Sequence, residues 1–170
     1  MFSSKTESGH GKRAAQTSPA DLHLHYYAKT GQLDGFTRRL VEHKGDLNAV
    51  YEYGDTLLIL ASRKGFVSIV KEILNYSLRK VEEEGKAAVN LEMKNSYGCT
   101  ALMEAARFNR VEICSLLIDH GADLESKNFL GETALIRAAC YNQDGVVNLL
   151  LAHGAQTYGL KIAPRIAALE

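Results

Sequence analysis

The sequence predicts an all-α solenoid of about four stacked helix–turn–helix repeats. Two observations support this prediction. One segment recurs after a fixed interval of 33 residues, and the only two prolines, Pro19 and Pro164, stand near the ends of the 170-residue chain. A fixed repeat period indicates stacked supersecondary units, and a long stretch without proline favours helices.

The clearest copies of the repeat lie in the second half of the chain. Residues 91–100 read LEMKNSYGCT, and residues 124–133 read LESKNFLGET. The match continues through the alanine pairs and the His-Gly-Ala triplets that follow each of these segments. An earlier copy begins at Gly54, 44 residues before Gly98, so it carries eleven extra residues. A degenerate first copy extends from about Leu22 to Asn48.

Each copy has signals for two helices. Thr100 and Thr133 stand where the first helix needs an N-cap, because a hydroxyl accepts an unpaired backbone N–H. A polar turn and a second amphipathic helix follow, for example residues 111–119. Glycine after that helix, at Gly121 and Gly154, suits a left-handed C-cap. One such pair cannot bury its apolar face alone, whereas stacked pairs can.

These features resemble the ankyrin repeat family. The period of 33 and the patterns Gly-x-Thr-Ala-Leu, Ala-Ala and Leu-Leu-x-x-x-Gly-Ala-Asp match that family over roughly residues 20–158. The family's usual proline after threonine is replaced by Leu57, Ala101 and Ala134. The resemblance implies an ankyrin-repeat solenoid that binds another protein and has no catalytic activity.

The repeats predict how the chain is divided. Residues 1–18 are expected to be a disordered tail, residues 19–158 the repeat domain, and residues 159–170 a C-terminal cap or a truncated repeat. Repeat boundaries are expected at about 20–50, 51–93, 94–127 and 128–158. The eleven extra residues fall near Tyr76 to Ala88, where the apolar spacing predicts a longer second helix over residues 68–88. This insertion is either a tolerated surface excursion or a protrusion that contacts a partner.

Composition argues against several classes of protein. Twenty basic and twenty acidic residues leave no positive excess for binding nucleic acid. The chain has no apolar run long enough to span a bilayer and no signal peptide. Three cysteines, an odd number without metal-ligand spacing, favour free thiols in a reducing compartment. We therefore expect a cytoplasmic monomer, with export into another cell left open.

No residue constellation predicts catalysis, a cofactor or a metal. Cys114 occupies an aliphatic position of the repeat, which favours a core thiol. His120 and His153 recur at one repeat position, which favours a structural role. His23 and His25, two residues apart on a helix, point to different faces and are poorly placed to ligate one metal.

The resemblance also predicts where a partner binds. It implies a concave surface made of the hairpin tips and the first helix of each repeat. The expected outward positions include the residue after each hairpin glycine, namely Asp55, Cys99 and Glu132. Aromatic and arginine side chains carry most interface energy. The predicted partner-binding residues are Tyr53, Arg63, Lys64, Tyr97, Arg107, Phe108, Phe129, Leu130 and Tyr141.

Two functions fit these expectations. The first is an adaptor, scaffold or stoichiometric inhibitor that acts by occupying a partner's surface. The alternative is the ankyrin targeting segment of a larger protein whose catalytic or effector domain lies outside this chain.

Overall fold

The computed structural model describes residues 19–42, 46–84 and 89–157, and within these ranges it contains eight α-helices and no β-strand. The predicted tail and the predicted C-terminal cap lie outside the described residues, as do residues 85–88 at the end of the predicted insertion. The all-α prediction is confirmed for the part that is described. The helices form four pairs: α1 (Pro19–Thr30) with α2 (Leu33–Glu42), α3 (Leu57–Lys64) with α4 (Val67–Glu84), α5 (Ala101–Arg107) with α6 (Val111–Asp119), and α7 (Ala134–Cys140) with α8 (Asp144–Ala152).

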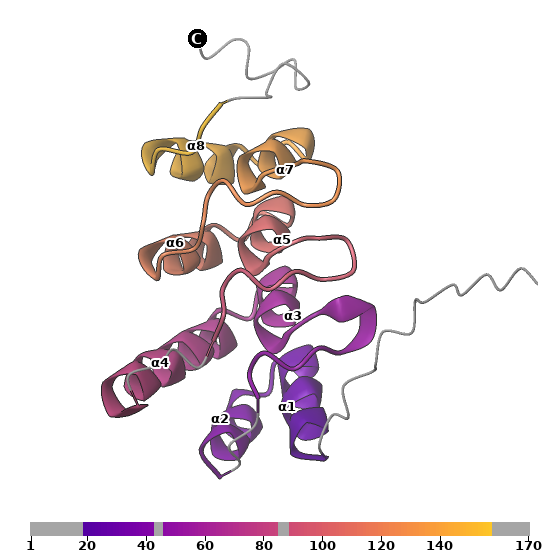
Figure 1. Ribbon diagram of the computed structural model, residues 1–170, viewed down its shortest axis with the longest axis vertical. Coiled ribbons are helices and arrows are strands. Elements are labelled where there is room, and N and C mark those ends of the chain that lie inside the picture. The colour runs from indigo at the N-terminus through magenta and orange to yellow at the C-terminus, as the bar shows by residue number, and fades with distance from the viewer. Residues whose placement is uncertain (1–18, 43–45, 85–88, 158–170) are drawn as a thin grey trace, which may run out of the picture.

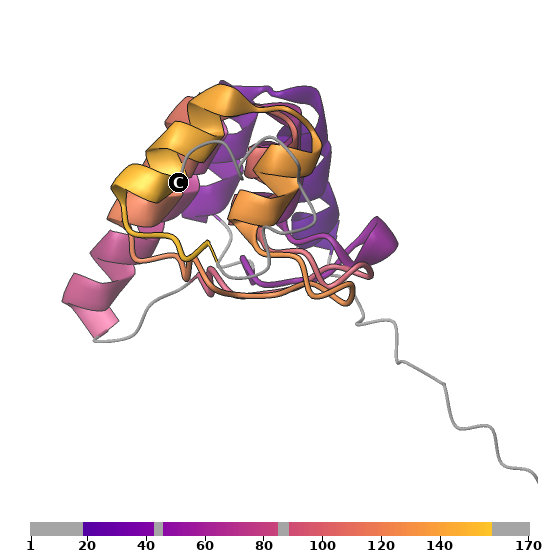
Figure 2. The same cartoon turned by 90° about the horizontal axis from the view of Figure 1, so that it is seen from above.

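The four pairs stack into one column (Figure 1). The inner helices α1, α3, α5 and α7 pack on one another in that order, and the outer helices α2, α4, α6 and α8 form a second layer beside them. The connections between pairs extend to one side of the helices and stack there (Figure 2). We call these connections, at residues 46–56, 89–100 and 120–133, the hairpin loops.

Threonine N-caps begin three of the inner helices. Oγ1 of Thr56, Thr100 and Thr133 accepts the backbone N–H three residues further on, at 3.2, 3.4 and 3.3 Å. Each hydroxyl satisfies one of the donors that the first turn of a helix leaves unpaired. The caps predicted at Thr100 and Thr133 are confirmed, and Thr56 adds a third at the same repeat position.

Glycines end two of the outer helices as predicted. Gly121 has φ 84° and donates its N–H to the Ile118 carbonyl at 2.9 Å. The next residue, Ala122, donates to the Leu117 carbonyl at 3.0 Å. These two bonds form a Schellman motif, which satisfies carbonyls at the helix end. The same pair of bonds recurs after α8, around Gly154.

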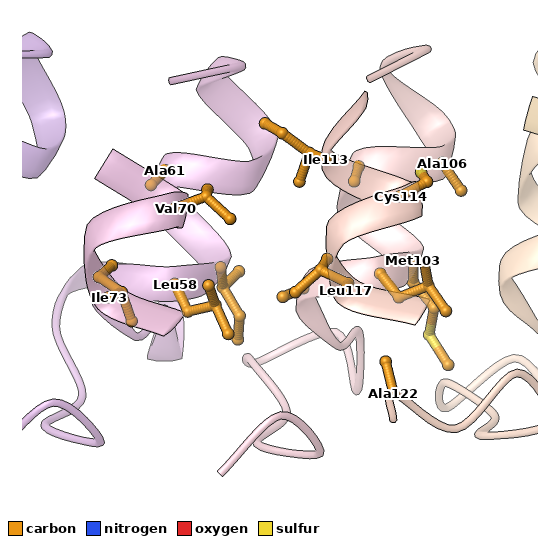
Figure 3. Close-up of a cluster of buried hydrophobic side chains, with 14 of the residues drawn as sticks. Leu58, Ala61, Val70, Ile73, Met103, Ala106, Ile113, Cys114, Leu117 and Ala122 are labelled. Atoms are coloured by element: carbon orange, nitrogen blue, oxygen red, sulfur yellow. The ribbon is translucent and has the colours of Figure 1, made fainter. Parts of the chain in front are cut away.

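The core lies between the inner and outer layers. Residues 57–62 of α3 and 101–106 of α5 are all buried, because neighbouring inner helices cover both sides of each. The small side chains of Ala61 and Ala106 belong to this core, next to bulkier residues of the outer helices (Figure 3). Cys114 is fully buried in it, and burial raises the pKa of its thiol to about 12. The predicted core thiol is therefore confirmed.

The outer helix of the second pair is longer than its counterparts. Helix α4 has 18 residues, whereas α6 and α8 have nine each. The C-terminal part of α4 extends beyond the ends of the other outer helices (Figure 2). The predicted extension of this helix is confirmed as far as Glu84. The hydroxyl of Ser77 accepts the Val89 N–H at 3.1 Å and so connects this extension to the following hairpin loop.

Candidate functional site

An acceptor side chain that recurs once per repeat connects each hairpin loop to the segment that follows the next outer helix. The acceptors are Oδ1 of Asn48 and Oε1 of Glu92 and Glu125, at distances of 2.8, 2.9 and 2.8 Å. Their donors are the backbone N–H groups of residues 90, 123 and 156. Because these bonds join successive loops in the same register, the loop tips form one continuous surface beside the inner helices.

Asparagine shapes the tips of the last two hairpin loops. Oδ1 of Asn95 accepts the N–H groups of residues 97 and 99, and Oδ1 of Asn128 accepts those of residues 130 and 132. Tyr51 occupies this position in the first hairpin loop and has no carboxamide. There Tyr53 adopts φ 59° and ψ 18°, in the left-handed region. A bulky residue in this region costs about 1–3 kcal/mol, and such strain clusters at functional sites.

The aromatic and aliphatic residues predicted for the binding surface are exposed. Tyr53 and Tyr97 are 68% and 61% exposed at their loop tips. Phe129 and Leu130 are still more exposed, while Phe108 and Tyr141, at the ends of α5 and α7, are about half-buried. Lys64 is exposed as well. The structure therefore places all seven residues at the surface, whereas their part in binding a partner stays a prediction.

Arg63 is much less available for binding a partner than predicted. Its guanidinium donates from Nη1 and Nη2 to the two carboxylate oxygens of Asp55, at 2.6 and 2.7 Å, and from Nε to Oε2 of Glu104, at 2.8 Å. Its pKa is raised: partial burial opposes the charge, but the hydrogen bonds and charges of Asp55 and Glu104 outweigh it. Arg63 therefore joins the second pair of helices to the third.

The ion pairs of Arg63 continue through Glu104 into the fourth pair of helices. Glu104 is almost completely buried, and its Oε1 accepts from Nη2 of Arg137 at 3.3 Å. Arg137 also donates from Nη1 to Glu132 at 3.3 Å. Buried charges occur in proteins when they are paired, because an unpaired one has a large desolvation penalty. Five alternating charges thus connect three successive repeats through their inner helices and loops.

Two expectations about the hairpin loops are wrong. Asp55 and Cys99, each following a loop glycine, were expected to face outward, yet both are buried. Asp55 turns inward because Arg63 and the Asn95 side chain both donate to its carboxylate. Cys99 turns inward under Asn128, whose Nδ2 lies 3.7 Å from its sulfur. Glu132, at the same repeat position, is partly buried by its bonds to Asn128 and Arg137.

Arg107 differs from Arg63 although it occupies the same repeat position. Its guanidinium lies over two aromatic rings, 5.0 Å from the centroid of Phe108 and 4.7 Å from that of Tyr141. Within the described ranges it forms no ion pair, and its buried Nε has no hydrogen-bond acceptor. Arg107 is thus a cation that lies over two aromatic rings and is not ion-paired with any described residue.

These residues surround a small pocket between the second and third pairs. Its lining consists of Tyr53, Arg63, Tyr97, Glu104, Arg107 and Phe108, and its volume is about 260 Å³. The pocket therefore brings together five of the nine predicted binding residues. Lys64, Phe129, Leu130 and Tyr141 lie outside its lining. Sites for drug-sized ligands have volumes of about 300–1,000 Å³, so this pocket suits one side chain rather than a cofactor.

Sequence reasoning missed Glu104 and Arg137. Both stand four residues after the capping threonine, between an apolar triplet and the alanine pair, and they are 33 residues apart. A charged residue flanked by buried positions on a short helix itself indicates a buried ion pair, since a buried charge requires an oppositely charged partner. Opposite charges at one repeat position supply that partner in the adjacent repeat.

Three histidines and Cys140 are the other side chains considered as candidates for chemistry. The Nδ1 atoms of His120 and His153 lie 2.7 and 2.9 Å from carbonyl oxygens four residues earlier, which supports the predicted structural role. His25 stacks on Tyr51, with ring centroids 4.3 Å apart. Cys140 is exposed on the predicted binding surface. The residues that the structure describes contain no group of three His, Cys, Asp or Glu side chains able to hold a metal.

In the described part of the chain, no helix combines the length and the apolar character that crossing a bilayer requires.

Two comparisons with known proteins indicate the family of this chain. Residues 81–159 match the family model described as Ankyrin repeats (3 copies). The chain is also similar to YahD of Escherichia coli (strain K12), which is named as an ankyrin repeat protein, with 34% identity over 90 residues. That match covers 50% of this chain and 40% of YahD.

Proposed function

We propose, since this chain is an ankyrin-repeat protein, that it binds another protein through the surface formed by its hairpin tips and inner helices. We call this surface the concave face. In this role the chain acts as an adaptor, a scaffold or a stoichiometric inhibitor, and it catalyses no reaction. The eight helices of the described residues stack as four pairs, so the proposal extends to the first two pairs, most of which precede the matched residues.

The observation that carries this proposal is the clustering of exposed aromatic side chains on one face. Tyr53, Tyr97 and Phe129 project from three successive loop tips and are each more than half exposed. Phe108 and Tyr141 continue the cluster onto the inner helices, with Arg107 between them. Tyrosine and arginine are enriched among the residues that dominate binding energy, and truncating one such residue costs about 2 kcal/mol or more.

The strained tip of the first hairpin loop supports the same assignment. Tyr53 keeps a left-handed backbone although it is 68% exposed and the side chain gains little from burial. A glycine or asparagine would adopt this conformation at lower cost. The strain therefore favours a role for the phenol ring at the surface over a role in folding.

The chain spans 40% of the length of YahD, the relative that it matches. The alternative proposal, an ankyrin targeting segment of a larger protein, therefore stays open beside the adaptor. Both place the binding surface on the concave face. We propose a monomer in the cytoplasm, because solenoids of this kind are commonly monomeric and all three cysteines are free thiols, as is usual in a reducing compartment.

Affinity capture from a lysate of the source cells tests the proposal. One bait is the natural chain, and a second carries Tyr53→Ala, Phe108→Ala and Tyr141→Ala. A third carries Leu78→Ala and Val81→Ala, which remove exposed apolar side chains from the extension of α4. Circular dichroism must first show that all three keep their helices.

A partner lost only with the aromatic variant supports the concave face. A partner lost only with the α4 variant contradicts it and assigns binding to the extension of α4.

A further inference from the structure

We propose that the pocket between the second and third pairs binds a carboxylate, supplied by an aspartate or glutamate side chain of the protein partner. The inference rests on the proposed function, since it takes the concave face as the binding surface. Arg107 is the residue that receives the carboxylate. Tyr53, Tyr97 and Phe108 form the walls that surround it.

The charges around the pocket single out Arg107. The carboxylate of Glu104 in the pocket lining is already bound by Arg63 and Arg137. Arg63 is in turn occupied by Asp55 and Glu104. Arg107 forms no ion pair with any residue that the structure describes. An incoming anion therefore finds at the pocket one guanidinium, that of Arg107, that is not already engaged in an ion pair with a described residue, whereas the Glu104 carboxylate there is already paired twice.

The stacking of Arg107 prepares it to bind a planar anion. A guanidinium presents its N–H groups as a rigid fork that matches a carboxylate in a bidentate geometry. The guanidinium carbon lies over the rings of Phe108 and Tyr141, 5.0 and 4.7 Å from their centroids, so the side chain is held in place by two cation–π contacts. Because the side chain is already held, binding loses little further rotamer entropy.

The size and the walls of the pocket favour one acidic side chain. A volume of about 260 Å³ lies below the range of typical cofactor sites. Tyr53 and Tyr97 add two aromatic rings to the rim, and no hydroxyl of theirs bonds to a described residue. The expected recognition element is therefore an acidic residue flanked by apolar residues, which contact Phe129 and Leu130 at the neighbouring tip.

A phage library of random dodecapeptides tests the inference. The library is selected on the immobilised natural chain and, separately, on Arg107→Gln and Lys64→Gln variants. Lys64 is an exposed cation of the same face outside the pocket lining, so its variant controls for general attraction between charges. We expect the natural chain and Lys64→Gln to enrich peptides with an aspartate or glutamate at one fixed position. Arg107→Gln should lose that enrichment.

The best peptide is then measured by titration against its own Asp→Asn or Glu→Gln version. We expect the amide to bind the natural chain about tenfold more weakly or worse, and to bind Arg107→Gln as well as the acid does. Peptides that bind and depend on Tyr53 and Phe108 but share no acidic position overturn this inference and leave the proposed function intact. Failure to select any peptide dependent on these aromatic residues overturns both.

Discussion

Replacing Glu104 with glutamine tests whether the buried charges hold neighbouring repeats together. The carboxylate is 3% exposed and binds Arg63 at 2.8 Å and Arg137 at 3.3 Å, one residue from each adjacent repeat. Removing one member of a buried ion pair costs about 3–5 kcal/mol, because the opposite charge stays buried without compensation. Arg63 retains Asp55 and Arg137 retains Glu132, so we expect the low end, a loss of about 3 kcal/mol.

A surface ion pair of the same kind supplies the control. Lys71 and Glu112 also connect the second pair of helices to the third, with Nζ and Oε1 2.7 Å apart. Their side chains are 49% and 60% exposed. Exposed pairs contribute about 0–1 kcal/mol, since water already solvates both charges. Glu112→Gln should therefore change the free energy of unfolding by less than about 1 kcal/mol.

Urea unfolding followed by far-ultraviolet circular dichroism measures both variants. Small proteins have m-values of about 1–3 kcal/mol per molar urea, so a loss of about 3 kcal/mol lowers the midpoint by roughly 1–3 M. Repeat arrays can unfold in steps, so the transition must be checked for a single phase. Equal midpoints for Glu104→Gln and Glu112→Gln would refute the reasoning, because burial would then confer no dependence on the charge.

Three further predictions concern the loops, the first helix and the thiols. Gly98→Ala should destabilise the chain by about 1–3 kcal/mol more than Gly131→Ala in the same urea assay. Both glycines have φ near 77°, but only at Gly98 would a Cβ meet a backbone nitrogen, 2.7 Å away in the next loop. Similar losses would show that only the left-handed backbone matters. Burial, reinforced by Lys29, lowers the pKa of His25 below its ordinary 6.5. Stability should therefore be full above pH 6.5 and decline as the pH falls below it, and His25→Gln should flatten that decline; an unchanged profile would count against this assignment. One of the three thiols, that of Cys140, should react with a disulfide reagent in the native chain, because the other two are buried; Cys140→Ser should abolish the fast reaction.

Features that repeat along the chain could be predicted from the sequence. The 33-residue interval located the capping threonines and the glycines after the outer helices, because the same local backbone need recurs in each copy. The surplus of eleven residues between Gly54 and Gly98 located the longer α4, since apolar spacing continued through it. Exposure of Tyr53 and Tyr97 followed from their place in the repeat.

Features that depend on contacts between repeats were missed. Asp55 and Arg63 occupy positions that face outward in the general pattern, but Arg63 pairs with Asp55 in its own repeat and with Glu104 across the repeat boundary. Arg107 shares the position of Arg63, but Cys99 and Arg137 occupy the repeat positions of Asp55 and Glu104, the two carboxylates that pair with Arg63. Repeat position alone therefore does not decide whether an arginine is structural or available. The side chains of the adjacent copies decide it.

The charge network also has a consequence for the order in which the chain unfolds. Its five members extend from Asp55 to Arg137 and so join the last three pairs of helices. Within the described ranges, the ion pair between the first and second pairs is that of Lys29 and Glu52, 3.8 Å apart and solvent-exposed. In a linear array, each unit is stabilised only by its neighbours. Amide hydrogens of α1 and α2 should therefore exchange with solvent first, while α3, α5 and α7 open together.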